Sequence, residues 1–145
     1  FSLFAFNNVT AQTIVAEIKG EDSNFIIDKD ELSDKWGNYI INQGVDNPQL
    51  VDFKILKTEK GEYYLVCKDT TERPEGFNAY GVVLKQNGSK LEVSGGSTCI
   101  CTGCESGCYP EYKQDNVWIC TDCLSTPDKC KKSVTATNPN NKAVF

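Results

Sequence analysis

The first two thirds of the chain contain several strand-like stretches, of which four are longer, and apolar residues take every second position in most of these four. This period of two is typical of β-strands that bury one face. The four longer stretches are residues 13–18, 50–56, 62–67 and 77–85. In the third stretch, Tyr63, Leu65 and Cys67 fall on one face. After the fourth stretch, the pair Asn87-Gly88 predicts a tight hairpin between neighbouring strands.

Between the first two stretches, one segment changes to the spacing of a helix. Large apolar residues recur there at i, i+4, i+7 and i+8, which places them on one helical face. They are Leu32, Trp36, Tyr39 and Ile40. Asp28 and Glu31 match the two polar positions of a capping box, and Gly44 suits a helix end. The pattern predicts an α+β fold, with one helix packed on an antiparallel sheet of hairpins or a meander.

The composition predicts that this α+β domain, at residues 13–94, has other segments on both sides. The chain opens with a short apolar run that ends in small residues, which predicts a signal-peptide remnant over residues 1–12. A Ser-Gly-Gly-Ser string predicts a flexible linker at residues 95–98. We expect a cysteine-rich module at residues 99–133 and a polar tail at residues 134–145.

Seven of the eight cysteines fall in the predicted module, which has too few large apolar residues to form a core of its own. Segments of this size are normally held together by disulfides or a metal ion. The disulfide candidates are Cys67, Cys99, Cys101, Cys104, Cys108, Cys120, Cys123 and Cys130. Because seven is odd, complete pairing requires Cys67 to bond into the module. We expect this bridge to tether the module to the sheet.

The same cysteines also match the spacing of metal sites. Two C-x2-C pairs separated by fifteen residues are typical of a zinc site with four thiolate ligands. The four ligands would be Cys101, Cys104, Cys120 and Cys123. The run from Cys99 to Pro110 resembles the bacterial ferredoxin motif, with one residue fewer at its start and Tyr109 before the proline. These resemblances imply zinc or an iron–sulfur cluster as an alternative cofactor.

Composition and charge remove several classes of function. The chain has no histidine, which excludes catalysis by serine–histidine or cysteine–histidine pairs, and we predict no catalytic residues. Its net charge of −5 would repel a phosphate backbone, so no nucleic-acid partner is expected. A Cys-Thr-Asp-Cys string at residues 120–123 resembles a thioredoxin active site. That resemblance implies a thiol–disulfide oxidoreductase as a third function.

Three short strings resemble those of small exported bacterial proteins of uncharacterised function. They are Val9-Thr10-Ala11-Gln12, Ile26-Ile27-Asp28-Lys29 and Gly107-Cys108-Tyr109-Pro110. The signal-like start and the cysteine-rich module predict an exported, non-enzymatic binding or surface protein, either secreted or held in the periplasm or at the cell surface. We expect an extracytoplasmic protein or glycan as its partner, no cofactor and no membrane span.

Overall fold

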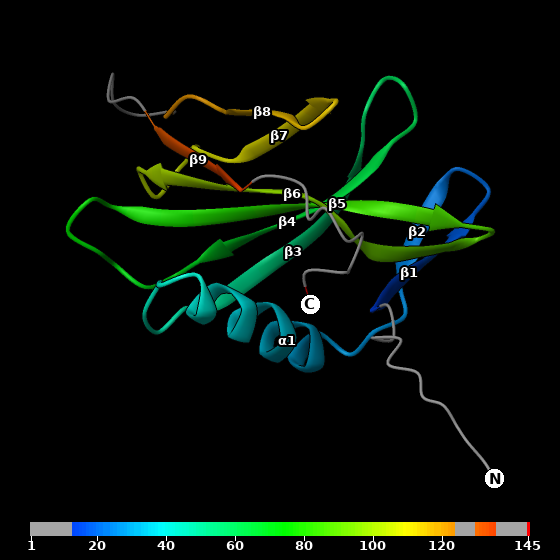
Figure 1. Ribbon diagram of the computed structural model, residues 1–145, viewed down its shortest axis with the longest axis horizontal. Coiled ribbons are helices and arrows are strands. Elements are labelled where there is room, and N and C mark those ends of the chain that lie inside the picture. The colour runs from blue at the N-terminus through cyan, green and yellow to red at the C-terminus, as the bar shows by residue number, and fades with distance from the viewer. Residues whose placement is uncertain (1–12, 124–129, 136–144) are drawn as a thin grey trace, which may run out of the picture.

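The computed structural model of the chain describes residues 13–123, 130–135 and 145 (Figure 1). The predicted signal-peptide remnant at residues 1–12 lies outside the described residues. Residues 136–144 of the predicted polar tail lie outside them as well.

Antiparallel strands make up most of the described chain. The strands are β1 (Ile14–Lys19), β2 (Asp22–Phe25), β3 (Leu50–Lys57), β4 (Tyr63–Asp69), β5 (Phe77–Asn87), β6 (Lys90–Gly103), β7 (Pro110–Gln114), β8 (Val117–Cys120) and β9 (Lys131–Thr135). The main sheet follows the order β2-β1-β6-β5-β4-β3, and β9 joins it along β6. The β7–β8 hairpin forms a second, separate sheet. The α+β prediction is confirmed as a class, although strands dominate.

One helix in the described chain, α1 (Lys29–Asn42), covers one face of the main sheet (Figure 1). Asp28 caps its start, because the Asp28 carboxylate accepts a hydrogen bond from the backbone N–H of Asp30 at 2.7 Å. The helix then turns its apolar stripe toward the sheet. The large side chains that it buries are Leu32, Trp36 and Ile40. The predicted packing of a helix on a sheet is therefore confirmed.

β6 passes through residues 95–98, which therefore do not form the linker that the sequence predicts. Its pairing with β5 is interrupted between Val82 and Leu84, where residues 94–97 of β6 bulge opposite Val83 alone. Glycine-rich strings suit such a bulge as well as they suit a flexible linker, which explains the wrong prediction. Beyond the bulge, β6 continues as a paired strand into the cysteine-rich segment.

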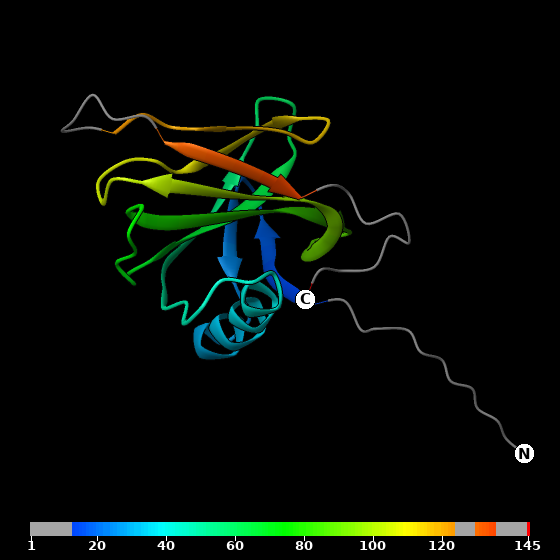
Figure 2. The ribbon, with the colours of Figure 1, turned by 60° about the vertical axis from the view of Figure 1, so that its left-hand side comes forward.

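The main sheet is covered on both faces (Figure 2). Alternate residues of β4 point into two different hydrophobic cores. Leu65 packs in the core under α1, whereas Tyr64 and Val66 pack in the core under the β7–β8 hairpin. The cysteine-rich segment therefore supplies the second cover and, through β9, a strand of the main sheet. It is built into the sheet and does not hang from it as an appendage.

Candidate functional site

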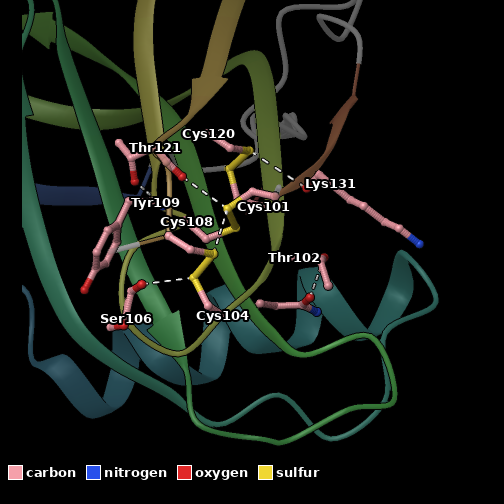
Figure 3. The surroundings of a disulfide bond; sticks show 12 residues. Cys101, Thr102, Cys104, Ser106, Cys108, Tyr109, Cys120, Thr121 and Lys131 are labelled. Carbon is pink, nitrogen blue, oxygen red and sulfur yellow. Dashed lines mark hydrogen bonds between the residues drawn. A yellow bond between two sulfur atoms is a disulfide. The ribbon is translucent and has the colours of Figure 1, made fainter. Parts of the chain in front are cut away.

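Three disulfides connect the β7–β8 region to the main sheet. They join Cys101 to Cys120, Cys104 to Cys123 and Cys108 to Cys130. Each bridge links a cysteine on β6 or after it to one at the end of β8 or beyond it, and the pairs follow the same order along both segments. Figure 3 shows the surroundings of the bridge between Cys101 and Cys120. The bonded cysteines are 19, 19 and 22 residues apart. Bridges over loops of this length stabilise a fold by roughly 3 kcal/mol each. The disulfide-stapled module is confirmed.

Cys99 lies two residues before Cys101 on β6 and faces the same side of the sheet. Its side chain is 1% exposed, and its thiol donates a hydrogen bond to the sulfur of Cys101 at 3.9 Å. Burial raises the pKa of the Cys99 thiol to about 12, and the nearby charge of Lys132 offsets only part of this rise. The thiol is therefore protonated, and slow to react, at neutral pH.

The predicted bridge from Cys67 to the module is wrong, because Cys67 is a free thiol. Cys67 shares a face of β4 with Tyr63 and Leu65, as expected, but that face packs against α1. The cysteines of the module lie on the opposite face of the sheet, so the sheet itself separates them from Cys67. Of the seven cysteines in the module, six form the three disulfides, and Cys99 is the one that stays free. Burial raises the pKa of the Cys67 thiol well above its ordinary value.

The sulfurs predicted as zinc ligands do not gather in one place. Among the described residues, the sulfurs form two groups, and within each group all atoms lie within 4.8 Å of one another. One group is Cys99, Cys101 and Cys120, and the other is Cys104, Cys123 and Cys130. The four predicted zinc ligands are divided between these groups. Of the ferredoxin-like run, Cys99 and Cys101 fall in the first group and Cys104 in the second, whereas Cys108 falls in neither. The two cysteines of the thioredoxin-like string do not bond to each other. Cys120 bonds to Cys101 on β6, and Cys123 bonds to Cys104 just beyond β6.

An aromatic cluster holds the hairpin on the sheet. Trp118 of β8 is buried, and its indole N–H donates to the hydroxyl of Ser97 at 2.9 Å. The ring packs on Gly81 of β5, where a Cβ atom would lie only 2.7 Å from the ring. The rings of Tyr64 and Tyr112 complete the cluster, with centroids 5.9 and 4.9 Å from that of Trp118. The hairpin is therefore held by close packing as well as by disulfides.

A groove of about 290 Å³ lies between the hairpin and strands β3 and β4. Its lining includes the apolar residues Leu56, Val66 and Pro110, the rings of Tyr64 and Tyr109, and the charged residues Asp52, Lys54 and Glu111. The ammonium group of Lys68 lies 4.9 Å from the ring centroid of Tyr109. No local sequence pattern indicates this groove, because its lining comes from separate segments of the chain that only the fold brings together.

A buried carboxylate, that of Asp69, lies outside the groove and was not predicted from the sequence. The Asp69 carboxylate accepts hydrogen bonds from the Tyr80 hydroxyl at 2.7 Å and the Arg73 guanidinium at 2.9 Å. It also accepts from the backbone N–H groups of Gln49 and Thr71. Burial alone would raise the pKa of Asp69, but these hydrogen bonds outweigh it and lower the pKa below its ordinary value. An acid at the end of an apolar strand, with an arginine four residues later, is the signal that could have revealed it.

No protein-family model matches the chain, and comparisons with curated proteins and with solved structures find no match either. Within the part of the chain that the structure describes, no helix has the length and apolar character needed to cross a membrane.

Proposed function

We propose that the chain is an exported, non-enzymatic protein that binds a glycan in the groove between the β7–β8 hairpin and strands β3 and β4. The observation that carries this proposal is the ordered set of three disulfides, which fixes one wall of the groove against the sheet. Disulfides persist mainly in oxidising compartments. They support a location outside the cytoplasm, either secreted, periplasmic or at the cell surface.

The size and lining of the groove favour a sugar over a protein as the ligand. Its volume of about 290 Å³ lies near the lower end for small-ligand sites, whereas a stable protein interface needs a much wider surface. The rings of Tyr64 and Tyr109 offer apolar faces, and the carboxylates of Asp52 and Glu111 offer hydrogen-bond acceptors. A sugar unit presents both an apolar ring face and a ring of hydroxyl donors.

The state of the thiols favours binding over redox catalysis. Cys67 and Cys99 are buried, and burial raises the pKa of each thiol, so neither supplies a thiolate at neutral pH. The two cysteines of the thioredoxin-like string are held in separate disulfides with other partners. A redox enzyme of that kind needs the two to bond to each other during its cycle.

Glycan binding can be tested with the oxidised full chain on a glycan array, followed by titration calorimetry with the best ligand. We expect Tyr109→Ala to weaken binding at least tenfold. The fold should survive this change, because the hydrogen bond from residue 109 to Thr121 uses the backbone N–H. Tyr39→Ala, on the α1 side of the sheet, is the matched control and should bind like the wild type. An array without any ligand, or equal losses in the two variants, would refute the proposal.

A further inference from the structure

The group formed by Cys99, Cys101 and Cys120 contains one sulfur more than its disulfide needs. All three sulfurs lie within 4.8 Å of one another, and those of Cys99 and Cys101 are 3.9 Å apart. The third sulfur, that of Cys99, forms no disulfide and does not line the groove. Cys99 has a counterpart in Cys67, which is also a free and buried thiol, but among the described residues the core around Cys67 contains no second cysteine. The grouping is therefore specific to the hairpin side of the sheet.

The three sulfurs form a triangle, and this shape distinguishes between two kinds of chemistry. In thiol–disulfide exchange, the attacking sulfur approaches along the axis of the bond that breaks. If Cys99 attacked Cys101 in this way, the three sulfurs would lie on one line. The Cys99–Cys120 distance would then be nearly the sum of the Cys99–Cys101 distance of 3.9 Å and the disulfide bond of 2.01 Å, whereas these two sulfurs lie within 4.8 Å of each other. The triangle instead resembles three ligands around one ion. With metal–sulfur bonds of about 2.3 Å, such ligands lie roughly 3.8–4.0 Å apart.

Two of the three sulfurs are held in place by the main sheet. Cys99 and Cys101 lie on β6, which is paired on one side with β5 and on the other with β9. Breaking the bridge to Cys120 leaves both of these strand ladders intact. Only Cys120, half-buried at the end of β8, has to move away from Cys101 by about 2 Å to reach the spacing of a metal ligand. Most of the site is therefore preorganised.

The surroundings of the triangle suit a soft cation. Cys99 and Cys101 are almost fully buried, which excludes water from that side of the group. Lys132 of β9 lies opposite Cys101 in the strand pairing, and its ammonium group is fixed by a hydrogen bond to the backbone oxygen of Trp118 at 2.8 Å. This positive charge would offset part of the negative charge of a complex with three thiolates.

We propose that, after reduction of the Cys101–Cys120 disulfide, the thiolates of Cys99, Cys101 and Cys120 bind one copper(I) ion. Thiolates select soft ions such as copper(I). Structural zinc sites take four protein ligands, whereas the sulfur group has three described members. A dithiol reductant supplies two electrons and two protons to the disulfide and becomes a disulfide itself. Copper(I) then displaces three thiol protons, which pass to solvent. The site does not depend on the ligand of the groove.

The test uses the full chain, reduced without oxygen by dithiothreitol and freed of the reductant. Copper(I) is added in competition with a chromophoric copper(I) chelator. Reduction also frees the second sulfur group, so the decisive comparison is between two variants that each lack one free thiol. Cys99→Ser should bind one copper equivalent fewer than the wild type, whereas Cys67→Ser should bind the same amount. The oxidised chain, with its three bridges intact, should bind none.

Two further measurements keep the test decisive. The double variant Cys104→Ser/Cys123→Ser removes two ligands of the second group, and it should keep the equivalent that depends on Cys99. X-ray absorption of this variant with one copper(I) equivalent should show three sulfur neighbours at about 2.3 Å, whether or not Cys99→Ser folds. Equal copper content in the two single variants, or a shell of only two sulfurs, would overturn the proposal.

Discussion

Replacing Gly81 with alanine should destabilise the fold, because Trp118 occupies the space that the missing side chain leaves. The added Cβ atom would lie 2.7 and 2.9 Å from two atoms of the Trp118 ring and 2.9 Å from Cβ of Pro110. Real Cβ contacts are not this short, so either the strand or the hairpin must shift. Overpacking of a buried position by one methyl group typically costs about 1–3 kcal/mol.

The cost should fall in the upper half of that range, because the ring has little freedom to move. Its indole N–H is bonded to Ser97, and the disulfide of Cys120, two residues later, fixes the same strand to β6. The hairpin therefore cannot lift from the sheet without breaking other contacts. Where neighbours cannot relax, the strain remains in the folded state.

Urea unfolding of the oxidised protein, followed by tryptophan fluorescence, measures this cost. Gly37→Ala is the matched control, because Gly37 lies inside α1 and an added Cβ there meets only Pro48 at 4.0 Å. Alanine in place of a helical glycine should stabilise the fold by up to about 1 kcal/mol. If Gly81→Ala unfolds within about 0.5 kcal/mol of the wild type, the close packing of Trp118 on β5 is wrong.

Two other predictions concern the thiols and the buried carboxylate. The oxidised chain should be six hydrogens lighter than its reduced form, with two thiols that react with an alkylating agent only after unfolding. Mass spectrometry tests this, and a loss of eight hydrogens would contradict the two free cysteines. Asp69→Asn should destabilise the fold by about 1–3 kcal/mol, because an amide cannot accept all the hydrogen bonds of the carboxylate. Since the pKa of Asp69 is lowered in the fold, its stabilisation is complete above about pH 4 and is lost as the pH falls through the folded pKa. Urea unfolding between pH 7 and pH 2 should therefore show a smaller acid loss in the variant than in the wild type.

Local patterns predicted the elements of this fold better than the relations between them. The capping residue Asp28 and the apolar spacing of the next turns were enough to predict α1. Period-two alternation correctly placed Tyr63, Leu65 and Cys67 on one face. Neither pattern says which face α1 covers, because that depends on pairing between strands that are distant in the sequence.

The pairing of the cysteines also depends on which face of the sheet each one occupies. Counting showed that Cys67 was needed for complete pairing, but counting takes no account of the two faces of a sheet. The alternation of β4 directs Cys67 toward α1, and the alternation of β6 directs Cys99 and Cys101 toward the hairpin. The spacing of the C-x2-C pairs was equally ambiguous, since the same spacing suits ligands of one ion and partners in two parallel bridges.

The burial of β4 explains why the chain needs both the hairpin and its disulfides. All five residues from Tyr63 to Cys67 are buried, so both faces of this strand require a cover. A continuous apolar run of this kind indicates a strand that is buried on both sides, and the sequence shows it. One helix can cover only one face. The other face is covered by the β7–β8 hairpin, whose two strands have only five and four residues. An isolated hairpin is marginally stable in water. The three disulfides therefore add to the packing of Trp118 in holding this small cover on the sheet, where it keeps Tyr64 and Val66 out of water.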